Sequence, residues 1–273
     1  MSRTEARTEA QSQAVMPQLG RLPAVGLEEL TTEAALLTRV DRKYLVPTAT
    51  ARRILSTFSA EARVLELAGA RSFAYDSVYF DTPALDSYML AAHGRRRRFK
   101  IRTRTYLDSA VSFLEVKTEG AREATVKERI PYEPGDRDRL TEEGLAYVNE
   151  TLSAALGEVA FGPLEPVLST RYDRTTLYLP ESGSRATIDS DVTWQRPDGQ
   201  PWVLDDAVVV ETKSGSAPGP LDRHLWANGV RPCRISKFAT GMAALHPELP
   251  ANRWNQTLRR RMPLRRVDQL PQS

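Results

Sequence analysis

The sequence predicts an α+β protein in which eight antiparallel strands close into a β tunnel with helices packed outside. Three observations support this fold class. Short runs that alternate apolar and polar residues dominate the chain from residue 39 to residue 214, segments with helical spacing are few, and the polar positions of several runs are charged. The interior of a closed eight-stranded barrel holds only side chains or one small ligand. The charges would therefore surround a narrow lumen.

Length and composition limit the possible classes. The chain has 273 residues, of which 41% are hydrophobic and 27% charged, and its net charge is only +3, too weak by itself to indicate nucleic-acid or membrane binding. One cysteine, Cys233, excludes an internal disulfide, and three histidines disfavour a Cys/His zinc site, so oxygen atoms should hold any metal. No segment approaches the roughly 18 apolar residues that span a bilayer. We expect a cytoplasmic protein without a transmembrane segment.

The expected organisation is one folded domain between two tails. Residues 1–25 carry few large apolar side chains and should form a disordered N-terminal tail. Residues 26–248 should form the tunnel domain. Residues 249–273 are rich in arginine and should form a basic C-terminal tail, either a solvated extension or a segment that holds polyanion near the tunnel exit.

The helices follow from apolar spacing and capping residues. We expect helices over Leu27 to Leu37, over Thr48 to Phe58 with Thr48 at the amino end, and over Pro220 to Trp226. A longer helix over Asp138 to Leu156 has apolar residues at helical spacing and should pack outside the sheet. The eight strands are expected at residues 39–46, 72–81, 98–106, 111–119, 124–132, 170–179, 184–194 and 206–214.

The strand at residues 98–106 carries a row of cations. Residues i and i+2 of a strand share a face and lie about 6.6 Å apart, so every second residue of this segment faces the same way. The row comprises Arg98, Lys100, Arg102 and Arg104. Charged pairs with the same spacing occur on three further strands, at Glu115 and Lys117, Lys127 and Arg129, and Glu211 and Lys213.

The usual explanation of such alternation is a solvated face opposite an apolar core face. The row at residues 98–104, however, is of one sign, whereas solvated faces usually mix signs. Cations inside a closed tunnel must be paired, so the missing partner is a polyanion, and phosphate matches arginine forks and lysine point charges. The few carboxylates then suggest a hard divalent cation, Mg²⁺ or Mn²⁺. Nucleic acid is disfavoured because aromatic residues are not interleaved with the cations.

Nine sequence fragments resemble the VTC (vacuolar transporter chaperone) domain in order and spacing over about residues 27 to 245. They are RVDRKYLVP, YFDT, KIRTR, LEVKTE, VKERI, RYDRTTL, ATID, VVVETK and ISKFATG. This family is similar to the triphosphate tunnel metalloenzymes, so the resemblance implies a basic eight-stranded tunnel. It also implies polyphosphate polymerase activity, in which a metal-dependent transferase moves the γ-phosphoryl group of ATP to a growing polyphosphate chain.

The resemblance implies the site residues by position. Those that hold the donor and the chain in line are Arg102, Arg104, Lys117 and Lys237. The further substrate-binding residues that it implies are Lys43, Lys127 and Arg174, and the cation row at residues 98–104 adds Lys100 to them. Glu211 is the implied metal ligand, while help from Asp41, Glu115 or Asp189 stays open. The wider superfamily opens with Glu-x-Glu-x-Lys, whereas Arg39, Asp41 and Lys43 stand here, so the metal site is poor in carboxylates.

The expected partners are ATP, inorganic polyphosphate and Mn²⁺ or Mg²⁺, with no nucleic acid. The acceptor phosphate is already an oxyanion, so the transfer needs no general base. Two alternatives stay open: a hydrolase of tripolyphosphate or nucleoside triphosphates with the same fold, and a non-catalytic module that binds polyphosphate or inositol phosphates. A separate membrane partner protein and the oligomeric state also stay open.

Overall fold

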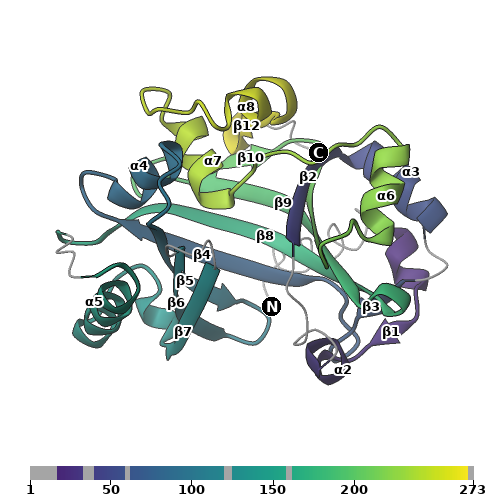
Figure 1. Ribbon diagram of the computed structural model, residues 1–273, viewed down its shortest axis with the longest axis horizontal. Coiled ribbons are helices and arrows are strands. Elements are labelled where there is room, and N and C mark those ends of the chain that lie inside the picture. Colours follow the sequence, from purple (N-terminus) through teal and green to yellow (C-terminus); the bar gives the residue numbers. More distant parts are fainter. Residues whose placement is uncertain (1–16, 33–39, 59–61, 120–124, 158–161, 270–273) are drawn as a thin grey trace.

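The structure is a computed structural model that describes residues 17–32, 40–58, 62–119, 125–157 and 162–269 (Figure 1). A large antiparallel sheet forms its centre, and helices pack around it, so the protein is of the α+β class. No helix in these ranges is both long enough and apolar enough to cross a membrane.

All eight predicted strands are present and lie side by side, each antiparallel to its neighbours. In spatial order they are β2 (Val40–Pro47), β11 (Ala207–Ser214), β9 (Ser184–Gln195), β8 (Glu165–Leu179), β4 (Phe73–Asp81), β5 (Arg98–Tyr106), β6 (Val111–Glu119) and β7 (Thr125–Tyr132). Alternation along each segment was therefore a sufficient signal for the long strands.

The predicted closed sheet of eight strands differs from the structure in two ways. Within the described ranges, the end strands β2 and β7 do not pair with each other, so no hydrogen-bonded ladder closes the sheet. The sheet also has twelve strands, because four short ones extend it, and two or three residues are too few to show alternation. The short strands are β1 (Ala24–Val25), β3 (Arg63–Leu65), β10 (Trp202–Leu204) and β12 (Leu264–Arg266).

Four helices lie where capping and spacing predict them. They are α2 (Leu27–Thr32), α3 (Thr48–Phe58), α5 (Glu142–Leu156) and α6 (Pro220–Ala227). The end of the first predicted helix, residues 33–37, lies outside the described residues. Helix α5 starts at Glu142 rather than Asp138 because the Thr141 side chain caps it, accepting a hydrogen bond of 3.1 Å from the Gly144 N–H.

Three helices were not predicted: α4 (Asp86–Ala92), α7 (Lys237–Leu245) and α8 (Asn255–Arg261). Single turns of 3₁₀ helix occupy Pro17–Arg21, Pro134–Asp136, Pro180–Ser182 and Val267–Gln269. Helices α4 and α8 have only seven residues each, and such short helices give little periodicity to detect.

The apolar side chains opposite the cation row form a core under a helix, as predicted. Phe99 and Ile101 of β5 pack with Leu114 of β6 and with Val148 and Leu152 of α5. Helices α3 and α6 cover the outer face of β2 and β11. The charges on these strands therefore face the other side of the sheet, toward its interior.

Parts of both predicted tails belong to the packed structure. Leu19, Leu22 and Val25 are buried, whereas residues 1–16 lie outside the described residues. Trp254 and Met262 are buried in the core, and β12 pairs with β10. The expectation of a solvated basic extension is therefore wrong for Trp254 to Arg266, where apolar residues between the arginines provide the contacts.

Candidate functional site

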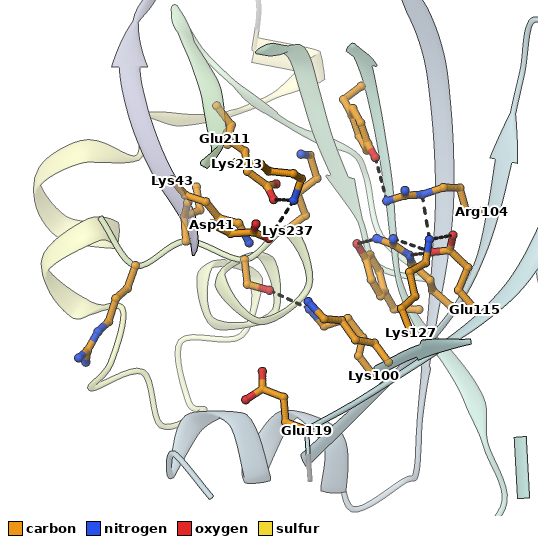
Figure 2. A pocket seen from close by; sticks show the side chains of 18 of the residues that line it. Asp41, Lys43, Lys100, Arg104, Glu115, Glu119, Lys127, Glu211, Lys213 and Lys237 are labelled. Atoms are coloured by element: carbon orange, nitrogen blue, oxygen red, sulfur yellow. Dashed lines mark hydrogen bonds and ion pairs between the residues drawn. The ribbon is translucent and has the colours of Figure 1, made fainter. Parts of the chain in front are cut away.

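One cavity of about 1280 Å³ lies inside the curved sheet and receives side chains from both of its end strands. Figure 2 shows charged side chains of β2 and β11 on one side of it and those of β5, β6 and β7 on the other. Thirteen Lys or Arg side chains and four Asp or Glu side chains line it, but no histidine among the described residues does. The cations are Lys43, Arg98, Lys100, Arg102, Arg104, Lys117, Lys127, Arg174, Arg185, Lys213, Arg234, Lys237 and Arg253.

Every site residue that the sequence predicts lines this cavity. The nine are Lys43, Lys100, Arg102, Arg104, Lys117, Lys127, Arg174, Glu211 and Lys237. Of the three carboxylates left open, Asp41 and Glu115 also line it, and Asp189 lies beneath its surface at 0% exposure. Arg39 lies outside the described residues.

A row of three lysines crosses neighbouring strands. Lys100 of β5 is directly opposite Lys117 of β6, which is directly opposite Lys127 of β7. Like charges in this position repel each other, and Lys100 and Lys117 have no carboxylate within 4 Å in the described part of the chain. The Lys100 ammonium donates a hydrogen bond of 3.1 Å to the Ser236 hydroxyl. Of this row, Lys127 pairs with Glu115, whereas Lys100 and Lys117 have no carboxylate partner among the described residues.

Burial and the charges of neighbouring cations hold the pKa of Lys100 well below its ordinary value, with Lys43 and Lys117 contributing most of the repulsion. Burial, followed by the charge of Lys43, also lowers the pKa of Lys117. An anion bound between these lysines would reverse the effect by favouring their charged forms.

The carboxylate of Glu115 holds one group of the cations that line the cavity. Its Oε2 accepts hydrogen bonds from Nε and Nη2 of Arg102 at 2.8 and 2.6 Å, and its Oε1 lies 2.5 Å from Nζ of Lys127. Burial raises the pKa of Glu115, but the charges of Arg102, Arg104 and Lys127 outweigh it and lower the pKa to about 2. Glu115 is therefore ionised and fixed, an anchor rather than a proton acceptor.

Asp189 has the same role for a second group of cations, and both groups contact Tyr172. The Arg174 guanidinium binds it through two parallel hydrogen bonds, and the Lys237 ammonium binds its Oδ2. This pairing is not on the surface, because Asp189 is buried. Burial raises the pKa of Asp189, and the charges of Arg174 and Lys237 more than compensate and lower it.

Helix α7 brings Lys237 to this pair. Ser236 caps the helix by accepting a hydrogen bond from the Ala239 N–H, and Trp194 donates to the Lys237 carbonyl at 2.7 Å. A Cβ on Gly241 would lie 2.2 Å from Trp194, so the close approach of α7 to β9 requires glycine there. Tight packing of α7 thus fixes the place of Lys237.

The candidate metal ligand Glu211 shares a cation with Asp41. Nζ of Lys213 donates to Glu211 Oε1 at 2.5 Å and to Asp41 Oδ2 at 2.8 Å. Burial raises the pKa of Glu211, but the charges of Lys43, Lys213 and Arg174 hold it well below its ordinary value. No group of three His, Cys, Asp or Glu suited to a metal occurs among the described residues. The donor set therefore fits a divalent ion that takes most of its oxygens from phosphate, not one caged by protein alone.

Sequence reasoning missed residues of two kinds. Tyr79 and Tyr172 accept hydrogen bonds from Arg102 and Arg104 at 3.3 and 3.2 Å, and their positions in β4 and β8 carry no charge signal. Ser236 and Arg234 belong to the loop before α7, where no periodicity applies. Lys213 shares the charged face of Glu211, but nothing local in the sequence shows that it binds two carboxylates.

The fold and this cavity define a class of α+β protein in which a large antiparallel sheet curves around a strongly cationic interior. The VTC domain family model matches residues 38–246. The chain belongs to this family, as its sequence fragments indicate.

The solved structures that resemble this chain are only distantly similar to it in sequence. A Bacillus halodurans protein is 11% identical, with a TM-score of 0.48 over 73% of this chain and 94% of that one. The Hippeastrum protein HpAC1, described as having a dominant triphosphatase activity, is 16% identical, with a TM-score of 0.48 over 75% and 95%. PH1819 from Pyrococcus horikoshii is 13% identical, with a TM-score of 0.42 over 74% and 97%. A comparison with curated proteins found no match.

Proposed function

We propose that this protein is a metal-dependent polyphosphate polymerase that moves the γ-phosphoryl group of ATP to the end of a polyphosphate chain. The observation that carries the proposal is the cavity with thirteen cationic and four acidic side chains. Such an excess of enclosed positive charge requires a polyanion. Membership of the VTC family supports phosphate chains as that polyanion.

The state of the carboxylates favours a phosphate acceptor over water. A hydrolase benefits from a base that takes a proton from water, but each of the four acidic side chains lining the cavity pairs with a cation. The pKa of Glu115 is about 2 and that of Glu211 is also lowered, so neither is suited to accept a proton near neutral pH. A terminal phosphate, already an oxyanion, needs no such base.

We assign the residues as follows. Arg102 and Arg104, oriented by Glu115 and the two tyrosines, bind phosphate oxygens as one group of cations, and Arg174 and Lys237, oriented by Asp189, bind them as a second group beside Tyr172. Lys43, Lys100, Lys117 and Lys127 hold further phosphates. Because the transition state of phosphoryl transfer spreads charge over equatorial oxygens, these fixed cations stabilise it and align donor and acceptor.

The proposal includes Mn²⁺ or Mg²⁺ held by Glu211, with Asp41 close by and phosphate oxygens completing the coordination. When bound, the ion neutralises charge on the phosphates. Lys213 contacts Oε1 of Glu211 and Oδ2 of Asp41, so the ion would bind the remaining oxygens of these carboxylates.

The deciding experiment gives purified protein ATP and, in turn, Mn²⁺, Mg²⁺ or chelator, and measures polymer on gels and free phosphate by colour assay. We expect metal-dependent polymer with little free phosphate. Free phosphate without polymer would identify a hydrolase, and tight tripolyphosphate binding with neither product would identify a binding module. The matched negative control is the Lys237→Met variant, which lacks one of the proposed clamps.

A further inference from the structure

A second, smaller cavity of about 330 Å³ adjoins the main one. The two cavities share the lining residues Cys233, Arg234 and Arg253, and in the part of the chain that the structure describes no carboxylate lines the second. Its full lining is Pro232, Cys233, Arg234, Asn252, Arg253, Gln256, Thr257 and Arg261. The positive lining of the main cavity therefore continues beyond the sheet.

Among the described residues, no carboxylate forms an ion pair with the three arginines of this second cavity. Nη1 of Arg253 donates to the Ala91 carbonyl at 3.3 Å, and Nη1 of Arg261 donates to the Arg231 carbonyl at 3.2 Å. The Arg234 guanidinium has neither a hydrogen bond nor an ion pair within the described ranges. Burial, and then the charges of Arg234 and Arg98, lower the pKa of Arg253. The arginines repel each other, and only part of their donor capacity is used.

The wall of this cavity packs against the rest of the protein and is not a loose tail. Trp254, 7% exposed, packs against Tyr88 with ring centroids 5.9 Å apart. The Thr257 hydroxyl of α8 donates a hydrogen bond of 3.0 Å to the Arg234 carbonyl, which joins the helix to the loop. Residues 252–261 also lie beyond residue 246, where the family match ends. This wall therefore lies outside the part of the chain that the family model matches.

We propose that the second cavity binds the phosphates of a linear polyanion whose end lies in the main cavity. The chain leaves the main cavity past Arg234 and Arg253 and then contacts Arg261. The inference rests on the proposed function and adds a site for the growing product. Tripolyphosphate occupies only the main cavity, whereas a chain of several tens of phosphates reaches both and gains affinity from the linked second site.

The test compares the affinities of tripolyphosphate and long-chain polyphosphate by calorimetry. The variant Arg261→Ala removes a charge that lines the second cavity but not the main one, and Arg260→Ala removes a charge from the same helix that lines neither. We expect Arg261→Ala to bind the long chain about tenfold more weakly, since it loses a charge-assisted contact, and to bind tripolyphosphate with less than a twofold change. The control should retain both affinities.

Other outcomes are distinguishable. If the long chain keeps its affinity for Arg261→Ala, or if Arg261→Ala and Arg260→Ala lose it equally, the second cavity is not a chain site. An equal loss for tripolyphosphate would overturn the inference in the same way, because the cavity would then belong to the triphosphate site. If the unaltered protein binds neither ligand, the proposed function itself fails.

Cys233 gives a second readout in the unaltered protein. It is the only cysteine of the chain and lines both cavities, so alkylation by neutral iodoacetamide reports one position at their junction. Saturating long-chain polyphosphate should slow alkylation more than saturating tripolyphosphate does. Equal rates with the two ligands would contradict a chain that passes Cys233.

Discussion

Arg174 and Asp189 face each other on adjacent strands and form a bidentate ion pair, with Nε to Oδ1 at 2.6 Å and Nη2 to Oδ2 at 2.9 Å. The same carboxylate binds Lys237 of α7. One buried acid thus fixes two cations that reach the cavity from a strand and from a helix. Glu115 likewise fixes two cations, Arg102 of β5 and Lys127 of β7.

Asp189→Asn should destabilise the protein by about 3–5 kcal/mol, because removing one member of a buried ion pair leaves uncompensated charge. Urea unfolding measures this. Asp198→Asn is the control, since that carboxylate is 85% exposed and should contribute less than about 1 kcal/mol. Tripolyphosphate should restore part of the lost stability by binding the released cations. Equal stability of the two variants would show that Asp189 is not an anchor.

Lys117→Gln should separate stability from binding. Lys117 faces Lys100 and Lys127 across the sheet, so neutralising it relieves repulsion and should leave the melting temperature unchanged or raised. Tripolyphosphate affinity should fall about tenfold as one charge-assisted contact is lost. Arg139→Gln, at an exposed arginine paired with Asp136, should change neither quantity by much. A lower melting temperature with unchanged affinity would mean that the lysine row is structural.

Glu211→Gln should abolish metal-dependent turnover and leave tripolyphosphate binding intact or tighter, because the variant keeps the cations and loses a repelling carboxylate. Chelator should have the same pattern of effects on the unaltered protein. Turnover is measured as polymer formation, and tripolyphosphate binding is measured by calorimetry without metal. Retained turnover in Glu211→Gln would remove Glu211 from the metal site.

The affinity for tripolyphosphate should depend on pH through Lys100. Its pKa is lowered well below the ordinary value. Lys100 therefore loses its charge as the pH rises through that lowered pKa, at a lower pH than an ordinary lysine does. The affinity for tripolyphosphate should fall over the same pH range. Binding should take up protons, which calorimetry in buffers of different ionisation enthalpy detects. Lys100→Arg keeps its charge and should hold affinity to higher pH. Identical pH profiles would exclude Lys100 as the titrating group.

The pH dependence of stability should follow Glu115. Its pKa in the folded protein is about 2, below its ordinary 4.5, so its contribution is complete above about pH 4.5 and disappears as the pH falls toward 2. Glu115→Gln should flatten that part of the stability curve. Unfolding by urea at a series of acidic pH values provides the measurement. An unchanged slope would assign acid sensitivity to other carboxylates.

The sequence by itself determined the eight long strands and, for four of them, the side that carries the charges. Alternation is local: once Arg102 faces one way, Lys100 and Arg104 must share that face and Ile101 must oppose it. This rule placed Lys100, Arg102, Arg104, Lys117, Lys127 and Glu211 on charged faces, whereas Lys43, Arg174 and Lys237 were expected from the resemblance to the VTC domain. All nine line one cavity.

Only the tertiary structure decided which charges meet. Lys213 pairs with Asp41 and Glu211, and Arg253 and α8 contribute to the cavities. Within the described ranges, β2 and β7 form no ladder. All three features depend on strand order and on contacts between distant segments. Periodicity specifies a face, but not the neighbour across it. Burial of Trp254 and Met262 likewise depends on the surface that the rest of the chain presents to them.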